Sequence, residues 1–381
     1  MGEWKEYRLG NILNFRRGHD LPKTQMQAGR IPVAGSNGII GYHNIATPIS
    51  PCITIGRSGN IGIPNIYDNC WAHNTVLYVD DFKGNYPLYL YYLLKILPIS
   101  SFGGGSAVPT LNRNHIHPLL VKHTTNISTQ IKIASILKSL DDKIENNKRI
   151  NENLEQQAQA LFKSWFIDFE PFHDQPFVDS ELGMIPEGWR VGTLGTICST
   201  NKCSWKGQIK SPIKYLDTGN ITRNKIDSIQ NLNPDIDLIP SRAKRCIVEG
   251  DIVYSTVRPN QEHYGILINP SSNLIVSTGF CVITANHSAY RYFIYQYLIQ
   301  DTIITKLQAI AEQSVSTYPS INASDIENLK VVIPSMEIAV KYATIMLPIY
   351  LQIEENQKQS LRLAQLRDTL LPKLMSGEIS L

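Results

Sequence analysis

An internal duplication is the feature that most limits how this 381-residue chain can fold. Each copy begins with Trp and a Leu-Gly pair, continues to a Pro-x-apolar-Asn landmark, and ends in a polar tail rich in Leu, Asn and Gln. The distance between matching stretches grows along the chain, so the second copy contains extra loop residues. Such a repeat indicates two structural units of the same kind. The matched stretches are residues 4–12 with 189–197, 109–116 with 319–326, and 144–147 with 353–356.

The two polar tails carry the clearest secondary-structure signal. No Gly or Pro occurs between Gln130 and Phe166, and apolar residues recur at alternating spacings of four and three. This is the heptad pattern of a coiled coil. The second tail repeats it, with a polar Asn at a matching position, and a buried polar seam residue fixes register and partner. The predicted seam residues are Leu140, Ile144, Asn147, Leu154 and Leu161 in the first tail, and Ile349, Ile353, Asn356, Leu363 and Leu370 in the second.

We expect the two tails to pack on each other, because their polar seam positions coincide. The alternative is that each helix only caps its own globular block. Pro348 is expected to start or kink the second long helix, and Pro372 to end or bend it. Neither proline has a counterpart in the first tail.

The globular blocks are predicted to be mixed α/β, with short strand-like runs between Gly- and Asn-rich turns. We expect strands near 31–34, 52–55, 75–79 and 119–122, a helix near 88–97, then strands at 252–255, 280–284 and 329–333, and a helix near 290–307. The connector between the blocks is acidic, contains Pro176 and Pro186, lacks Lys and Arg, and is expected to be exposed. The predicted domains are 1–126 and 189–334 (globular), 127–170 and 335–381 (long helices), and 171–188 (linker).

Composition restricts the class of protein. Hydrophobic residues make up 43% of the chain and the net charge is only +3, which excludes a mainly disordered chain. No run approaches the ~20 apolar residues of a membrane-spanning helix, and the start of the chain is polar rather than a secretory signal. The six cysteines form no CxxC pair, which favours reduced core thiols. These features predict a cytoplasmic protein with no membrane partner.

Motifs for catalysis and cofactor binding are missing from the sequence. It contains no GxxxxGK[ST] loop, no GxGxxG fingerprint after a strand, no Asn-Pro-Pro-Tyr, no HExxH and no GxSxG. His115 and His117 have metal-like spacing without accompanying ligands, so we interpret them as surface or turn residues. Asp141 and Asp142 are interpreted as part of a solvated helix face beside Lys138 and Lys143. We therefore predict that the chain is not an enzyme and holds no metal or cofactor.

Polar loops with base-reading side chains recur in both blocks. Arg and Lys read guanine, Asn and Gln read adenine, and Ser and Thr read either. In both blocks an Arg- and Asn-containing loop follows a hydrophobic strand directly, at Arg57 and at Arg258. Taken singly, each loop could be an ordinary polar turn, and the recurrence favours DNA binding. The candidate DNA-binding residues are Ser36, Asn37, Tyr42, His43, Arg57, Ser58, Asn60 and Arg113 in the first block, and Lys206, Lys210, Asn220, Arg223, Lys225, Thr256, Arg258, Asn260 and Gln261 in the second.

With these features in place, the chain resembles the specificity (S) subunits of Type I restriction–modification enzymes along essentially its whole length. The resemblance lies in the two Trp-x-x-x-x-Leu-Gly openings, the Ile-Pro-Glu-Gly-Trp sequence that ends at Trp189, and the Gly-Arg-Ser-Gly-Asn-Ile-Gly loop at residues 56–62. The two Pro-x-apolar-Asn landmarks, the heptad tails and the end of the chain at 369–378 are also similar to the family.

The resemblance implies two α/β (α+β) target-recognition domains in pseudo-repeat, separated by two long antiparallel coiled-coil helices. Each domain of the family reads one half of a split, asymmetric double-stranded DNA site. The helices set the gap and dock two modification (methyltransferase) subunits, which carry S-adenosylmethionine. Restriction (endonuclease/translocase) subunits, which use ATP and Mg²⁺, add to that core. The S subunit itself is non-catalytic, and the resemblance is weaker in the second loop, which lacks the GxSGxxG pattern.

Two other classes of function remain open from the sequence. The first is a non-catalytic coiled-coil assembly adaptor that has lost sequence-specific DNA reading, which should bind DNA weakly and without preference. The second is an enzyme with an unrecognised nuclease site, which should cut DNA by itself with Mg²⁺. The sequence leaves open both half-site sequences and the gap length.

Overall fold

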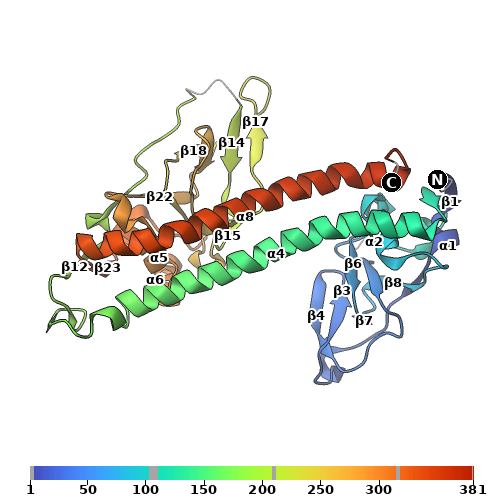
Figure 1. Cartoon of the computed structure of the whole chain (residues 1–381), viewed down its shortest axis with the longest axis horizontal. Helices are drawn as coiled ribbons and strands as arrows, with labels where there is room; N and C mark the ends of the chain where they lie inside the picture. The colour runs from blue at the N-terminus through green and yellow to red at the C-terminus, as the bar shows by residue number, and fades with distance from the viewer. Residues whose placement is uncertain (1–3, 103–109, 208–211, 315–317, 380) are drawn as a thin grey trace. The chain divides into compact units, whose positions relative to one another are not determined.

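The chain divides into two compact units, and each long helix contributes to both. The computed structural model describes residues 4–102, 110–207, 212–314, 318–379 and 381. Unit 1 comprises Met1–Glu145 and Ser360–Leu381, and unit 2 comprises Asn146–Gln359. Helices α4 (Ile127–Phe166) and α8 (Met336–Ser376) are the two long helices in Figure 1.

Within the described residues, unit 1 contains three small sheets, three short α-helices and two 3₁₀ helices. The largest sheet has the strand order β2-β8-β5-β6, and a three-stranded sheet has the order β4-β3-β7. The elements are β1 (Trp4–Arg8), α1 (Leu9–Ile12), β2 (Asn14–Arg17), η1 (Lys23–Gln25), β3 (Ile31–Gly35), β4 (Gly38–His43), β5 (Cys52–Gly56), β6 (Pro64–Tyr67), β7 (Trp71–Ala72), β8 (Val76–Asp81), α2 (Pro87–Ile96), η2 (Ile99–Phe102), α3 (Arg113–Ile116) and β9 (Leu120–Thr124).

Unit 2 contains two four-stranded sheets, with the orders β13-β22-β19-β20 and β17-β14-β21-β18. Its strands are β10 (Phe177–Val178), β11 (Ile185–Pro186), β12 (Arg190–Thr193), β13 (Cys198–Thr200), β14 (Ile213–Leu216), β15 (Ile221–Thr222), β16 (Lys225–Ile226), β17 (Gln230–Leu232), β18 (Ala243–Cys246), β19 (Ile252–Ser255), β20 (Tyr264–Ile266), β21 (Leu274–Ser277), β22 (Phe280–Ala285) and β23 (Lys330–Ile333). Its helices besides α4 and α8 are η3 (Glu170–Phe172), η4 (Leu194–Thr196), η5 (Thr218–Asn220), η6 (Pro259–Gln261), η7 (Ser288–Tyr290), α5 (Arg291–Leu298), α6 (Asp301–Glu312) and α7 (Ala323–Glu327).

The units repeat most of the sheet topology, with β18 as an additional strand in unit 2, which confirms the predicted fold class. The strand that opens each sequence repeat pairs antiparallel with the last strand of its unit, β1 with β9 and β12 with β23. Each unit also contains one parallel pair, β3 with β7 and β14 with β21. Because the same crossovers occur in the same order, the duplication seen in the sequence is also a duplication of the fold.

Helices α4 and α8 pack against each other and run antiparallel. In unit 1, Arg367 Nη1 donates a hydrogen bond to Asp141 Oδ1 over 2.6 Å. In unit 2, Asn147 Nδ2 donates to Gln359 Oε1 over 2.8 Å, and Asn151 Nδ2 donates to the carbonyl of Ile353 over 3.1 Å. Higher residue numbers in α4 therefore meet lower numbers in α8.

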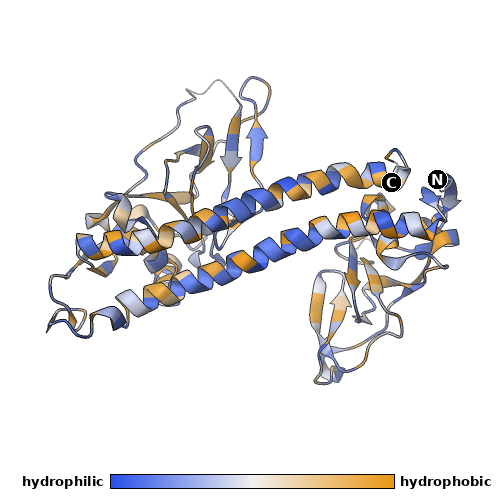
Figure 2. Cartoon of the chain, viewed as in Figure 1, coloured by the Kyte–Doolittle hydropathy of each residue, from blue (hydrophilic) through white to orange (hydrophobic). Residues whose placement is uncertain are grey.

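The seam between these helices changes character along its length. Asn147 and Asn356 are 0% and 6% exposed, and Asn356 Nδ2 donates to Asn151 Oδ1 over 2.8 Å. Figure 2 shows long hydrophilic stretches in the middle of both helices. Amide pairing rather than apolar packing therefore sets the register there. Of the remaining predicted seam residues, Ile353 is buried, Leu154, Leu161 and Ile349 pack against the unit 2 core, Leu370 packs against the unit 1 core, and Leu140, Ile144 and Leu363 are half-buried.

Aromatic side chains form much of the unit 2 core. Phe166 lies against Trp189, Phe293 and Tyr342, with ring centroids 5.7, 4.9 and 4.7 Å apart. Trp189, the residue that opens the second repeat, is 7% exposed. The unit 1 core instead combines α2 with Phe15 and with residues from the ends of both long helices. The repeated Trp therefore has a packing role in unit 2.

Two expectations about helix ends were wrong in part. α8 begins at Met336 and ends at Ser376, so Pro348 does not start it and Pro372 does not end it. Both prolines are exposed, so each missing amide hydrogen bond lies on the solvent side, where water can satisfy the carbonyl. The predicted helix near 290–307 is two helices, because Gln300 has an extended backbone between α5 and α6.

The connector 171–188 is exposed at most of its positions, as expected, although it contains the β10–β11 pair and buries Phe172 and Ile185, which are 4% and 3% exposed. The expectation for Asp141 was wrong. Asp141 is half-buried rather than on a solvated face, because Tyr92 and Arg367 both donate hydrogen bonds to its carboxylate. Asp142, by contrast, pairs with Lys138 on an exposed helix surface.

Candidate nucleic-acid interface

Backbone bonds on both sides hold the Arg57 loop of unit 1 in place. Arg57 follows β5 directly, and its amide donates to the carbonyl of Thr75 over 2.8 Å. The amide of Leu111 donates to the carbonyl of Arg57 over 2.7 Å, and Ser58 forms an antiparallel bridge with Thr110. The loop is therefore fixed between the start of β8 and the Pro-x-apolar-Asn landmark.

Glycine is required where this loop turns back on itself. A Cβ on Gly56 would lie 1.7 Å from the carbonyl oxygen of Asn60, so no side chain fits there. Gly59 has a φ of +78°, which L residues rarely adopt. The amide of Gly62 closes the turn by donating to the carbonyl of Gly56 over 2.9 Å. The glycine spacing thus presents Arg57, Ser58 and Asn60 on a tight backbone.

The structure brings the Ser36-Asn37 turn next to this loop. These two residues connect β3 and β4, and the amide of Ser36 donates to Thr75 Oγ1 over 3.3 Å. A Cβ on Gly59 would lie 3.5 Å from both Ser36 Oγ and Asn37 Oδ1. Five of the candidate residues, Ser36, Asn37, Arg57, Ser58 and Asn60, therefore belong to one polar cluster, which we call recognition loop 1.

The other three candidates of unit 1 lie elsewhere. His43 is 5% exposed, and its Nδ1 accepts a hydrogen bond from the amide of Gln27 over 3.0 Å. This burial removes it from the residues that we propose to meet DNA. Arg113 Nη1 donates to the carbonyl of Phe15 over 3.0 Å, an internal bond that explains its presence without DNA. Tyr42 is 56% exposed on β4 and stays a candidate.

Two residues of this region were missed by the sequence reasoning. Thr75 contacts both parts of recognition loop 1 through its hydroxyl and its carbonyl. Arg17 lies close enough that its charge, together with burial as the larger cause, lowers the pKa of Arg57. Neither residue stands in a motif, and only the adjacent Arg16-Arg17 pair could have drawn attention to β2.

Unit 2 holds its loop with the same backbone bonds. The amide of Thr256 donates to the carbonyl of Gly279 over 2.9 Å, and the amide of Ile321 donates to the carbonyl of Thr256 over 2.8 Å. Val257 forms an antiparallel bridge with Ser320. Thr256 therefore stands where unit 1 has Arg57, and Arg258 stands where unit 1 has Gly59. We call residues 256–261 recognition loop 2.

Arg258 occupies an unusual position in recognition loop 2. Its φ of +48° is left-handed, as at Gly59, although it carries a side chain. The guanidinium lies over the ring of Tyr318, 5.6 Å from the centroid. The side chains of Asn260 and Gln261 are exposed beside it, whereas Thr256 Oγ1 donates to the carbonyl of Gly279 over 3.0 Å.

The three candidates at 220–225 lie on an insertion that unit 1 lacks. Residues 217–229 connect β14 to β17, where unit 1 needs only the Ser36-Asn37 turn. Asn220 Nδ2 donates to Asp217 Oδ1 over 2.7 Å and its Oδ1 accepts from Ser228 Oγ. Arg223 pairs with Glu262, and Lys225 pairs with Asp227 at 2.8 Å. All three thus already have internal partners.

This insertion is anchored to both long helices within unit 2. Asn224 is buried at the turn between β15 and β16, and its Nδ2 donates to Glu155 Oε1 of α4 over 2.7 Å. Gln357 Nε2 of α8 donates to the carbonyl of Asn224 over 2.6 Å. Tyr350 also donates to Glu155, over 3.2 Å. Burial is the main cause that raises the pKa of Glu155 to about 7.

The last two candidates lie on the segment that precedes β14. Lys206 is exposed, next to Trp205, whose amide donates to the carbonyl of Lys244 over 2.8 Å. Lys210 lies outside the described residues.

Comparison with known proteins identifies the family. The chain matches the family described as "Type I restriction modification DNA specificity domain" over residues 1–156 and 186–363. The chain belongs to this family. It is therefore a DNA specificity subunit of a Type I restriction–modification system, a non-catalytic component of that enzyme.

Two curated relatives and one solved structure are similar to this specificity subunit. The MjaIX specificity subunit of Methanocaldococcus jannaschii is 32% identical over 310 residues, which cover 76% of this chain and 68% of the relative. The HindI specificity subunit of Haemophilus influenzae is 26% identical over 310 residues, covering 66% and 67%. The S subunit from M. genitalium aligns with a TM-score of 0.64 at 15% identity, covering 98% of this chain and 96% of that one, which supports the fold.

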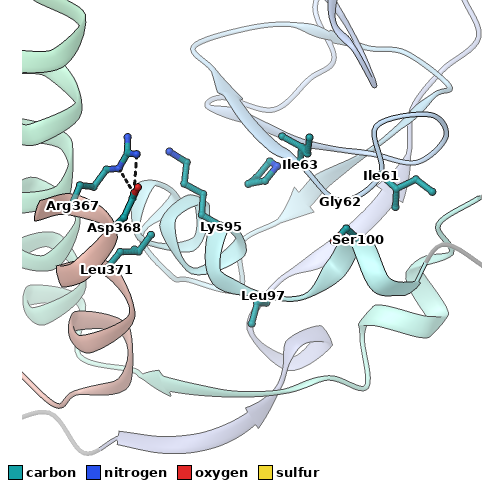
Figure 3. Close-up of a pocket in the computed structure, with 10 residues that line it drawn as sticks. Ile61, Gly62, Ile63, Lys95, Leu97, Ser100, Arg367, Asp368 and Leu371 are labelled. Atoms are coloured by element: carbon teal, nitrogen blue, oxygen red, sulfur yellow. Dashed lines mark hydrogen bonds and ion pairs between the residues drawn. The ribbon is translucent and has the colours of Figure 1, made fainter. Parts of the chain in front are cut away.

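A hollow of about 400 Å³ lies beside residues 61–64 of the specificity subunit, in unit 1 (Figure 3). The cationic side chains that line it already form ion pairs: Arg367 pairs with Asp141 and Asp368, and Lys95 pairs with Asp141. The hollow therefore offers no evident site for a charged ligand. It is lined by Ile61, Gly62, Ile63, Pro64, Lys95, Leu97, Ser100, Arg367, Asp368 and Leu371.

In the part of the specificity subunit that the structure describes, no group of three or more His, Cys, Asp or Glu side chains is placed to hold a metal ion. Within the same ranges, no helix combines the length and apolar character needed to cross a membrane.

Proposed function

We propose that this specificity subunit reads a split, asymmetric double-stranded DNA site, one half with recognition loop 1 and the other with recognition loop 2. The proposal is supported by one observation: the two recognition loops share the same backbone arrangement but carry different side chains. A fixed arrangement presents side chains to DNA in the same way, and different side chains on it select different bases. Arg57, Asn60 and Ser36 are the proposed base-reading groups of the first half, with Arg258, Asn260 and Gln261 in the second.

Methylation-aware sequencing tests this proposal directly. DNA from a host that expresses the chain with its modification subunit should carry methyl groups at one bipartite motif with a fixed gap. Exchanging residues 1–126 for those of another specificity subunit should change one half of the motif and leave the other half intact. An undivided motif would contradict the proposal. Methylation that is absent while the same modification subunit works with another specificity chain would favour the assembly adaptor.

We also propose that α4 and α8 set the gap between the half-sites and dock two modification subunits. Each helix is continuous across the boundary between the units, and Asn147 and Asn356 fix the register of the pair. An insertion in one helix alone would break that register. The test therefore inserts seven residues in both helices, between Glu145 and Asn146 and between Gln359 and Ser360.

Seven added residues lengthen each helix by ~10 Å, or about three base-pair rises. The methylated motif should keep both half-sites and gain about three unread base pairs. The control is the same insertion in α4 alone, which should abolish methylation because it separates the paired amides. An unchanged gap in the double insertion would exclude the helices as the spacer.

The remaining partners follow from the family and are part of the same proposal. Restriction subunits would add to the complex of this chain with its modification subunits. S-adenosylmethionine, ATP and Mg²⁺ would bind in those partners, in the cytoplasm. Gel filtration of the co-expressed subunits, which should give one chain of this protein with two modification subunits, tests the core stoichiometry.

A further inference from the structure

Arg17 lies on the same sheet as the Arg57 side of recognition loop 1. It ends the edge strand β2, where it pairs with Leu77 of the neighbouring strand β8. Ile55 of β5 pairs with Leu77 from the other side. Because paired residues on antiparallel strands share a face, Arg17 and Ile55 point to the same side of the sheet.

Arg57 continues this face beyond the end of β5. It stands two residues after Ile55, and side chains two residues apart along a strand share a face. Its amide bonds to Thr75, two residues before Leu77 on the opposing strand. Arg17 and Arg57 are therefore diagonal neighbours across β8. Arg16 pairs with Tyr78 and points to the other face.

The two guanidinium groups repel each other in a partly shielded place. Burial and the charge of Arg17 are the causes that lower the pKa of Arg57, and no carboxylate is among them. Within the described ranges, no ion pair joins Arg17 or Arg57 to an acidic side chain. Two cations that the backbone holds together without a counter-charge form a site that an anion stabilises.

We propose that Arg17 binds a phosphate of the DNA backbone beside the base pairs that recognition loop 1 reads. It is then a positioning residue of the first half-site, which fixes the register of the DNA and carries no base preference itself. A phosphate fits better than a base because Arg17 is on a strand rather than on the turns that form recognition loop 1. The inference rests on the proposed function, since it requires that recognition loop 1 faces DNA.

The test compares Arg17→Gln with Arg16→Gln in the complex with the modification subunits. The two arginines are adjacent and exposed on the same strand, and only Arg17 faces Arg57. Binding is measured at several salt concentrations, on DNA with the complete site and on DNA with the first half-site scrambled. Arg17→Lys is a third variant, which retains the charge.

For Arg17→Gln we expect a several-fold loss of affinity on both DNAs, with the ratio between them unchanged. The slope of log K against log salt should fall by about one. Arg17→Lys should keep most of the slope, and Arg16→Gln should match the wild type. An unchanged slope in Arg17→Gln, or a loss of affinity confined to the DNA with the complete site, overturns the inference. The salt slope does not depend on sequence preference, so the two failures are distinguishable. A wild-type complex with no preference for the complete site would contradict the proposed function.

Discussion

Recognition loops 1 and 2 are held by the same three backbone contacts but differ in nearly every side chain that they present. Arg57 and Thr256 make the same amide and carbonyl hydrogen bonds, to Thr75 and Leu111 in unit 1 and to Gly279 and Ile321 in unit 2. Gly56 stands where unit 2 has the buried Ser255. The backbone arrangement is thus the common element, and the side chains on it are free to differ.

The loops also differ in what surrounds them. Within recognition loop 1 the residues from Arg57 to Asn60 lie beside the two-residue Ser36-Asn37 turn, whereas unit 2 has the insertion 217–229 at that point in the chain order. The insertion uses most of its polar groups internally and is anchored to α4 and α8 through Asn224. Unit 1 therefore uses tight turns at glycine to hold its recognition loop. Unit 2 instead uses side-chain contacts to the long helices to hold the segment at 217–229. The following predictions test that contrast.

Gly56→Ala should have the largest effect, because the new Cβ meets the carbonyl oxygen of Asn60. We expect unit 1 to lose about 2–4 kcal/mol of unfolding free energy, since backbone must move to relieve the contact. Recognition of the first half-site should fall with it. Denaturant unfolding and methylation of single half-site variants are the measurements.

The matched control is Ser255→Ala, at the same position of unit 2. Ser255 Oγ makes only local hydrogen bonds, to Val257. Its removal should cost about 1 kcal/mol. If the two substitutions cost the same, the units do not differ in how tightly they constrain this position.

The carboxylates of α4 predict opposite pH dependences in the two units. In unit 2, burial raises the pKa of Glu155 to about 7 from its usual value near 4.5. The folded state then holds a proton that the unfolded state releases, so stability should fall as pH rises from about 5 to 7. The change is up to about 3 kcal/mol. Glu155→Gln should remove this dependence while keeping a side chain of the same shape.

Asp141 in unit 1 should show the reverse. Burial acts to raise its pKa, but hydrogen bonds from Arg367 and Tyr92 outweigh it and lower the pKa. Its contribution is therefore present near neutral pH and lost as pH falls below about 4. Thermal unfolding of Glu155→Gln and Asp141→Asn across pH 3–8 separates the two. A Glu155→Gln variant with the wild-type profile would show that folding does not shift the pKa of this carboxyl group.

Arg57→Ala should weaken discrimination at the first half-site by ~1–3 kcal/mol if the guanidinium makes a bidentate base contact. Thr256→Ala, at the equivalent backbone position, should change discrimination at the second half-site by less than about 1 kcal/mol, because its hydroxyl already bonds to Gly279. Binding to DNAs with each base pair of the two half-sites changed in turn is the measurement. Equal loss on all DNAs would make Arg57 a phosphate contact.

The sequence was informative where a local pattern carries the geometry. The glycine spacing at 56–62 and the Ser36-Asn37 turn were found because tight turns need Gly and Asn. The seam residues Asn147 and Asn356 were found because heptads are local as well. By contrast, Arg258 was equated with Arg57 because both follow a strand. The backbone contacts of Gly279 and Ser320 show instead that Thr256 is the residue equivalent to Arg57 and that Arg258 is equivalent to Gly59. No local sequence pattern contains this shift of two residues.

Other features depend on contacts between distant parts of the chain. Thr75 meets Ser36 across 39 residues, and Arg17 reaches Arg57 only through the pairing of β2 with β8. His43 has the composition of a surface ligand, yet the amide of Gln27 and the ring of Trp71 enclose it. Burial of this kind follows from sheet packing, so a sequence pattern over a few residues does not predict it.

Arg258→Gly should have the smallest effect on stability, and the informative result is whether it stabilises or destabilises unit 2. A left-handed L residue costs roughly 1–2 kcal/mol that glycine avoids, while an exposed cation–π contact such as that with Tyr318 contributes ~0.5–1 kcal/mol. We therefore expect unit 2 to gain up to about 1 kcal/mol in stability while affinity for the second half-site falls. Gly59→Ala makes the opposite change in unit 1 and should cost about 1 kcal/mol. A loss of stability in Arg258→Gly would mean that the contact with Tyr318 outweighs the backbone, and that recognition loop 2 is held by its arginine where recognition loop 1 is held by its glycines.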